Sequence, residues 1–212
     1  MQTAQPLPPS PLREARIDDS PEVFTQIYDP ACNLAVWQRT LPGAVHDYLS
    51  RCLSDERRIH LKTLFTCQPE MHLQVRDSLE QTLPQGEGRQ ALIDDIVQLM
   101  EMYACLFEPR LIGIRLATLQ QAMCPRFHVD YLPARLVTTY FGAGTQWLSE
   151  PTTGEARIPA QEPTHFEQLN TGDVALLKGD GWFENEGLGI VHRSPAVAAG
   201  SSRLFLSLDW AD

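Results

Sequence analysis

Residues 124–131, CPRFHVDY, guide the assignment of the fold, because they place a histidine and an aspartate two positions apart in a strand-like segment. Side chains alternate between the two faces of a strand, so residues i and i+2 project from the same face. We therefore expect His128 and Asp130 to point together. A second histidine, His192, follows in GIVHRSP at 189–195, and it joins them if its strand lies beside the first.

Outward from this segment, the chain after residue 109 is a succession of short stretches rich in β-branched and aromatic residues. Each is bounded by Gly, Pro, Asp or Ser, which is typical of strands separated by turns. Six or more such strands within about a hundred residues predict a sandwich or barrel rather than a parallel sheet with crossover helices. The stretches are LIGIRLATL, RFHVDYL, RLVTTYF, DVALLKG, LGIVHRS and RLFLSLDW.

The first half of the chain has a different pattern. Residues 1–20 hold four prolines among small polar residues and predict a flexible leader. Residues 21–109 read as mainly helical, most clearly over 89–107, where apolar residues recur at helical spacing until Pro109 ends the helix. We expect an α+β protein in which this helical region packs on a β-rich core at 110–212, with 21–212 forming one compact domain.

Composition restricts the possible partners. The formal net charge of -10 disfavours nucleic acid, whose phosphates an acidic surface repels. Apolar stretches are far shorter than the roughly 20 residues of a membrane-spanning helix, and the N-terminus lacks the pattern of a signal peptide. Five scattered cysteines with no CxxC pair indicate reduced thiols rather than disulfides or a zinc ribbon. We expect a cytoplasmic protein, monomeric or homodimeric, without a membrane or nucleic-acid partner.

Two imidazoles and one carboxylate on one face of an octahedral ion leave up to three positions open. Non-haem Fe(II) oxygenases use this ligand set, because the open positions admit a bidentate cosubstrate and dioxygen. An oxo-acid bound to the metal at one end needs a cation at its far carboxylate, and Arg203 follows His192 by 11 residues. Arg203 could equally pair with a structural carboxylate such as Asp209 or Asp173.

The order of these motifs resembles that of the Fe(II)/2-oxoglutarate-dependent dioxygenases, especially their prolyl-hydroxylase-like branch. The order is HVD at 128–130, RLVTTYFG, TGDVALLKG, then His192 and Arg203. More closely, NLAVWQR at 33–39, CPRFHVD at 124–130 and RLFLSLDW at 203–210 resemble a bacterial family known as DUF1826, which brings no established activity.

The superfamily resemblance implies a double-stranded β-helix (a cupin-type jelly roll) over about 110–210. It implies Fe(II) as the metal, with His128, Asp130 and His192 as ligands, and 2-oxoglutarate as a cosubstrate. Arg203 would bind the far carboxylate of 2-oxoglutarate, and Thr138 and Tyr140 would contact it. The chain departs from the pattern at two positions: Phe205 stands where many relatives have Ser, and Lys178 stands where an aromatic residue is common.

These features predict an oxygenase that hydroxylates a small molecule or peptide. Two alternatives remain open at the level of sequence. A cupin-type barrel with the same ligands could bind Zn, Mn or Ni for non-redox chemistry, or the protein could carry or sense a metal without catalysis. Arg126, Arg135 and Arg193 flank the expected ligands, and they either recognise an acidic substrate group or are simply solvated.

Overall fold

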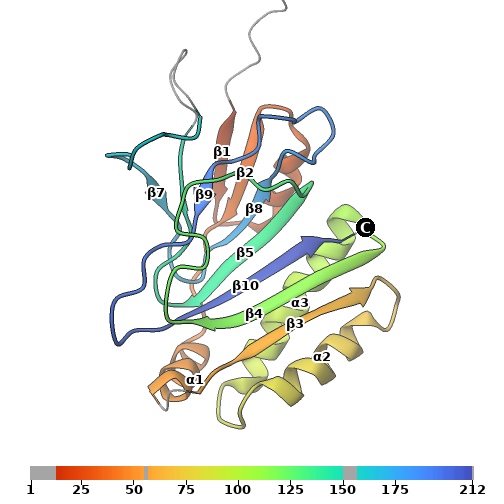
Figure 1. Ribbon diagram of the computed structural model, residues 1–212. Coiled ribbons are helices and arrows are strands. Elements are labelled where there is room, and N and C mark those ends of the chain that lie inside the picture. Colours follow the sequence, from red (N-terminus) through yellow and green to blue (C-terminus); the bar gives the residue numbers. More distant parts are fainter. Residues whose placement is uncertain (1–12, 55–56, 150–156, 212) are drawn as a thin grey trace, which may run out of the picture.

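The structure, a computed structural model, describes residues 13–54, 57–149 and 157–211. Helices dominate the first half of the described chain and strands the second (Figure 1). The helical elements are the 3-10 helix η1 (Pro21–Tyr28) and the α-helices α1 (Gly43–Ser54), α2 (Met71–Thr82) and α3 (Arg89–Phe107). The strands are β1 (Glu14–Asp18), β2 (Cys32–Trp37), β3 (His60–Thr66), β4 (Leu111–Leu119), β5 (Ala134–Phe141), β6 (Gln146–Trp147), β7 (Glu167–Gln168), β8 (Val174–Lys178), β9 (His192–Arg193) and β10 (Arg203–Trp210).

The strands form two sheets. The larger is seven-stranded in the order β1-β2-β8-β5-β10-β4-β3, and the smaller is three-stranded in the order β7-β6-β9. Neighbouring strands are antiparallel except β1 and β2, which pair in parallel. The expected combination of helices with a β-rich core is confirmed as a layer of helices on a large sheet, which is mainly antiparallel.

Helices cover one face of the large sheet, where α2 and α3 lie across it (Figure 1). Helix α3 spans the predicted residues and buries an apolar stripe that includes Leu92, Ile96 and Tyr103. The helix ends at Phe107 because the residue before Pro109 is disfavoured from right-handed helical geometry, and that residue, Glu108, has a left-handed backbone (φ 46°). Among the described residues, no helix combines the length and apolar character that crossing a membrane requires.

The other face of the large sheet faces the small sheet. A separate apolar cluster lies on this side and joins Val137 on β5 and Phe205 on β10 to Trp147 on β6. Alternate residues of β5 and β10 therefore project between the sheets, while the residues between them project toward the helices. Polar residues on the inter-sheet face of these strands are placed to line a site.

Three strands occur where the sequence pattern predicted none. Strand β1 lies within the part expected to be a flexible leader, whose residues 1–12 are outside the described residues. Strands β2 and β3 lie within the part expected to be mainly helical. All three extend the large sheet at its two edges, so the N-terminal half contributes strands as well as a helical layer.

Two expected strands are much shorter than predicted. The segment around His128 is an isolated bridge to His192 rather than a strand, and the stretch LGIVHRS contributes only the two residues of β9. Pro125 and Pro133 bracket the first segment, and proline cannot donate the amide hydrogen bond that a ladder needs. The bridge nevertheless places the two histidines side by side.

Candidate metal centre

His128 and His192 face each other across the isolated bridge. The backbone N–H of each donates to the carbonyl oxygen of the other, at 3.0 Å from His128 and 2.9 Å from His192. Residues paired this way project their side chains to the same side of the ladder. The two imidazole ring centroids lie 4.6 Å apart, so the expected meeting of these two histidines is what the structure contains.

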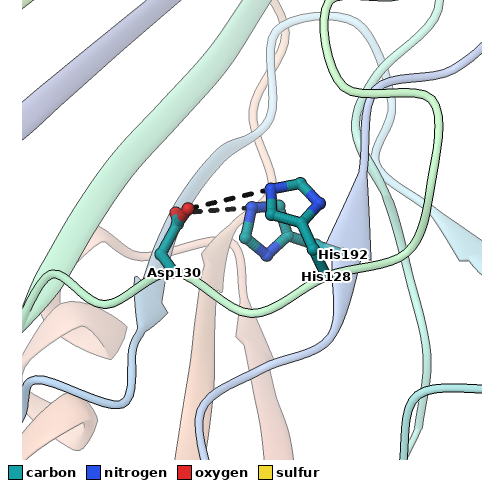
Figure 2. Close-up of side chains that lie close together, drawn as sticks. All are labelled: His128, Asp130 and His192. Carbon is teal, nitrogen blue, oxygen red and sulfur yellow. Dashed lines mark ion pairs between the residues drawn. The ribbon is translucent and has the colours of Figure 1, made fainter.

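Asp130 faces both rings (Figure 2). One carboxylate oxygen lies 3.4 Å from Nε2 of His192, and the other lies 3.8 Å from Nε2 of His128. The backbone of Asp130 is fixed because its carbonyl accepts a 2.8 Å hydrogen bond from the N–H of Asp180. One ligand atom from each of the three side chains lies within 4.8 Å of the other two. Adjacent ligands of an ion with bonds of about 2.1 Å are separated by about 3 Å, so this cluster is close to the required geometry.

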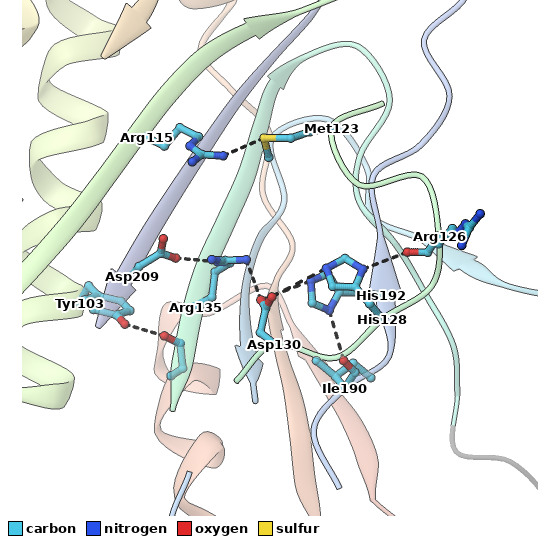
Figure 3. A network of polar contacts seen from close by, with 11 residues as sticks. Tyr103, Arg115, Met123, Arg126, His128, Asp130, Arg135, Ile190, His192 and Asp209 are labelled. Atoms are coloured by element: carbon cyan, nitrogen blue, oxygen red, sulfur yellow. Dashed lines mark hydrogen bonds and ion pairs between the residues drawn. The ribbon is translucent and has the colours of Figure 1, made fainter. Parts of the chain in front are cut away.

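The imidazoles are oriented by backbone carbonyls. Nδ1 of His128 lies 2.9 Å from the carbonyl oxygen of Arg126, and Nδ1 of His192 lies 3.2 Å from that of Ile190 (Figure 3). A carbonyl can only accept, so Nδ1 of each ring donates to it, and each ring turns its Nε2 toward Asp130. Metal-binding histidines are oriented in the same way by contacts of their second nitrogen. The donor set therefore fits a divalent transition metal.

Arg135 holds the carboxylate of Asp130 from the side opposite the imidazoles. Its Nη1 donates to Asp130 at 2.7 Å, and its Nε donates to Asp209 at 2.5 Å (Figure 3). Burial alone would raise the pKa of Asp130, but the contact with His192 and the charges of Arg135 and His128 leave that pKa below its ordinary value. Asp130 is thus an oriented carboxylate whose lowered pKa favours the ionised form, and Arg135 is occupied rather than available to a substrate.

Replacing Arg135 by glutamine is expected to weaken Fe(II) binding by about 10- to 100-fold, because the carboxylate of Asp130 loses the group that orients it. Calorimetric titration with Fe(II) under nitrogen measures the effect. The matched control is Arg76→Gln, which breaks a 2.7 Å pair with Asp94 on the helical surface and should leave metal affinity unchanged. Equal affinity in Arg135→Gln and the parent protein would show that Arg135 does not support the site.

The other two flanking arginines do not face the cluster as free cations. Arg193 is bound to Gln146 at 2.7 Å and to Glu162, and it lies over the ring of Phe127. The side chain of Arg126 is exposed, and its backbone carbonyl is the part that contacts His128.

Arg203 is a buried cation without a carboxylate partner among the described residues. It is 1% exposed, and its Nε donates to the carbonyl of Ala143, while Nη2 donates to the hydroxyls of Thr139 and Thr145. Its Nη1 has no hydrogen-bond partner within the described chain. Burial lowers the pKa of Arg203 to about 10, which reflects the cost of holding this charge away from water.

The structural carboxylates considered for Arg203 are engaged elsewhere. Asp209 binds Arg135, and Asp173 accepts hydrogen bonds from the backbone and side chain of Asn170. Thr145, which holds Arg203, also lines a cavity of about 180 Å³ that is shared with the three candidate ligands. A buried, unpaired guanidinium beside this cavity is suited to bind an anion.

Thr138 and Tyr140 are not at the site, which corrects the prediction that they contact a cosubstrate. They project from the helical face of β5, whereas Arg135 and Val137 project into the cavity. Tyr140 donates a 2.6 Å hydrogen bond to Asp95 on α3, and the hydroxyl of Thr138 is buried without a partner in the described structure. The prediction assigned the wrong face of β5 to the cavity. The threonine that holds Arg203 is the neighbouring Thr139.

Tyr140 has a structural role instead. Its hydroxyl and the guanidinium of Arg39 share the carboxylate of Asp95, so one buried and two partly buried polar groups join α3 to the sheet. Tyr140→Phe is expected to lower the free energy of unfolding by about 1.5–3 kcal/mol, because Asp95 loses a hydrogen bond to a charged group. Urea denaturation measures this loss, and metal affinity should not change. Tyr131→Phe, at an 89% exposed residue, is the control and should stay within about 0.5 kcal/mol.

Two residues that hold Arg203 were not identified from the sequence. Thr145 follows the turn at Gly142 and Gly144, and Thr139 lies among the apolar residues of β5. Thr139 lies two positions from Val137 and so shares its face of β5, but no local signal marks that face as the one opposite the helices, because Leu136 and Val137 are both apolar and buried.

Comparison with known proteins bears on both the family and the fold. A family model described as "Protein of unknown function (DUF1826)" matches residues 18–209. No curated protein matches the chain.

The chain is similar in structure to dioxygenases. It matches the dioxygenase for auxin oxidation from rice with a TM-score of 0.54 and 12% identity, over 93% of this chain and 82% of that one. It matches the corresponding Arabidopsis thaliana enzyme, solved with 2-oxoglutarate, with a TM-score of 0.54 and 10% identity, over 94% and 92% of the two chains. A prolyl-4-hydroxylase from Pseudomonas putida gives 0.43 and 13%, over 89% and 96%. At these identities the first two likenesses show a shared fold.

Proposed function

This chain belongs to the DUF1826 family, and from that premise we propose that it is an Fe(II)- and 2-oxoglutarate-dependent oxygenase that hydroxylates its substrate. The observation that carries the proposal is the convergence of two imidazoles and a carboxylate beside a buried arginine without a carboxylate partner in the described chain. His128, Asp130 and His192 would hold the metal, and Arg203 would bind the far carboxylate of 2-oxoglutarate.

The sheet order supports a double-stranded β-helix as the core of this enzyme. Strands β4, β10, β5 and β8 would form one of its sheets, and the His128 segment with β9, β6 and β7 would form the other. The remaining strands and the helices would then be additions from the N-terminal half. The motif order from His128 to Arg203 supports the prolyl-hydroxylase-like branch of the superfamily.

Each residue of the site has a physical task in this mechanism. The carboxylate of Asp130 offsets one unit of metal charge, and the three ligands occupy one face of the ion so that the other face stays open. Arg203, held by Thr139 and Thr145, would bind an incoming carboxylate through Nη1, which has no hydrogen-bond partner in the described chain. When bound, Fe(II) with 2-oxoglutarate supplies the oxidising chemistry. Val137 and Phe205 limit the water that reaches the cavity.

The buried arginine favours this function over a non-redox metal site. A hydrolase or metal carrier built on the same three ligands has no need for an unpaired guanidinium, whose burial is costly. A dicarboxylate cosubstrate gives that charge a partner. The Arabidopsis enzyme of similar fold was solved with 2-oxoglutarate, which also supports this cosubstrate here.

Anaerobic spectroscopy tests the proposal without knowledge of the substrate. Adding Fe(II) and then 2-oxoglutarate to the metal-free protein should produce the weak visible charge-transfer band of the chelate. Admitting oxygen should then convert 2-oxoglutarate to succinate. Metal binding with neither the band nor succinate would overturn the oxygenase, and turnover that depends on zinc would replace it with non-redox chemistry.

A further inference from the structure

Arg115 on β4, like Arg135, lines the cavity of about 180 Å³ that contains the three candidate metal ligands, which we call the metal cavity. It is half-buried, its cross-strand partner on β10 is Ser207, and both residues line the cavity that contains His128, Asp130 and His192. Figure 3 shows Arg115 extending from the sheet toward the same loop segment that carries the candidate ligands.

The guanidinium of Arg115 has no carboxylate partner among the described residues. Its one side-chain contact there is from Nη1 to the sulfur of Met123 at 2.9 Å, and a thioether is a weak acceptor. Asp130 and Asp209, the acidic residues of the cavity, are both bound by Arg135. The charge of Arg115 is therefore uncompensated within the site.

A second cation reinforces this positive region. Lys62 on β3 is the direct cross-strand partner of Arg115, and it makes no ion pair in the described part of the chain. Like charges directly opposite each other on neighbouring strands are unfavourable. An anion placed between Arg115 and Lys62 would turn this repulsion into attraction.

Arg115 also lies at the boundary between two cavities. A second cavity, of about 430 Å³, shares Arg115 and Asp209 with the metal cavity and is walled mainly by apolar residues, including Leu64, Leu132 and Trp210. Its volume suits a small molecule rather than a folded partner. A ligand held at Arg115 would thus extend its apolar part into this second cavity and its reactive carbon toward the cavity that contains His128, Asp130 and His192.

Charge balance in the loaded site points in the same direction. A divalent ion and doubly charged 2-oxoglutarate cancel each other, and Arg135 with Arg203 offsets Asp130 and Asp209. Arg115 alone is left without a negative partner inside the cavity. Resting on the proposed function, we propose that the substrate is a small organic anion whose acidic group is bound by Arg115, assisted by Lys62, and whose apolar part occupies the second cavity.

Matched probes test this assignment. The protein is loaded under nitrogen with Fe(II) and saturating 2-oxoglutarate, then titrated in a calorimeter with hexanoate, hexyl phosphate and the uncharged hexanamide. Both anions should bind at least tenfold more tightly than hexanamide, because each accepts charge-assisted hydrogen bonds from Arg115. The stronger of the two identifies the acidic group. Hexanamide binding as tightly as both anions would overturn the proposal.

Single substitutions test which residues bind the anion. Arg115→Met should weaken anion binding about tenfold or more, and Lys62→Met should weaken it less, because Lys62 is exposed. Arg58→Met removes a charge from an exposed arginine outside both cavities and should have no effect. Anion binding unchanged by Arg115→Met would overturn the assignment, as would a loss of 2-oxoglutarate affinity in that variant, which would make Arg115 a cosubstrate residue.

The two proposals fail in distinguishable ways. Repeating the hexanoate titration without metal and 2-oxoglutarate measures the anion site by itself. If the parent protein lacks the charge-transfer band yet binds hexanoate through Arg115, the oxygenase fails and the anion site stands. If the band is present but Arg115→Met binds hexanoate like the parent, the anion site fails and the oxygenase stands.

Discussion

Alanine in place of His128, Asp130 or His192 is expected to reduce Fe(II) affinity by more than about 100-fold. Loss of a contact that merely orients a ligand costs 10- to 100-fold, and loss of the ligand itself removes a metal bond. Asp130→Ala should have an additional effect, because Arg135 and the metal would then repel each other without the intervening carboxylate. Anaerobic calorimetry with Fe(II) measures all three variants.

Two substitutions outside the cluster are the controls. His72→Ala removes a half-buried imidazole whose Nδ1 also contacts a backbone carbonyl, and Asp94→Ala removes an exposed carboxylate that is bound to an arginine. Both should bind Fe(II) like the parent protein. Should any of the three cluster variants retain parental affinity, the metal is held elsewhere and the proposed function loses its foundation.

Arg203→Met is expected to leave Fe(II) binding intact and to weaken 2-oxoglutarate binding by between about 30-fold and a few thousand-fold. Removing one partner of a buried charge pair costs 2–5 kcal/mol, which corresponds to this range. Arg203→Lys should fall between parent and Met, because lysine keeps the charge but lacks the planar fork. Titration of the anaerobic charge-transfer band with 2-oxoglutarate measures all three proteins.

Thermal unfolding gives an independent measurement. In the presence of metal, 2-oxoglutarate at 100 times its dissociation constant should stabilise the parent protein by about 2.7 kcal/mol, and the same concentration should give Arg203→Met much less. If the Met variant is stabilised as strongly as the parent protein, Arg203 does not contact the cosubstrate, and its burial needs another cause.

The elements with a strong local pattern were predictable. Helix α3 follows from its apolar stripe and Pro109, and β4, β5, β8 and β10 follow from β-branched and aromatic residues between turns. Strand β2 was missed because five of its six residues are buried, so no alternation marks it. Strand β3 was missed although exposed His60 and Lys62 alternate with partly buried Leu61.

The features of the candidate site also differ in whether a local sequence pattern predicts them. The joint orientation of His128 and Asp130 depends only on their spacing, so it could be predicted from the sequence. Which face of β5 points into the cavity could not be predicted, because Leu136 and Val137 are both apolar and buried. The identity of that face depends on where the helices pack. The carbonyls that orient the imidazoles and the pairing of Arg135 with Asp209 are tertiary contacts that no local pattern encodes.

The bridge between His128 and His192 joins positions that are 64 residues apart in the chain. Closing a loop of that length costs the unfolded polypeptide about 3.7 kcal/mol of entropy beyond a constant term. The folded backbone has already incurred this cost through the paired amides of the bridge, whereas an unfolded chain would have to incur it on binding. An ion would therefore be captured after folding rather than during synthesis, and once bound it would act as a clip that opposes separation of the His128 segment from β9.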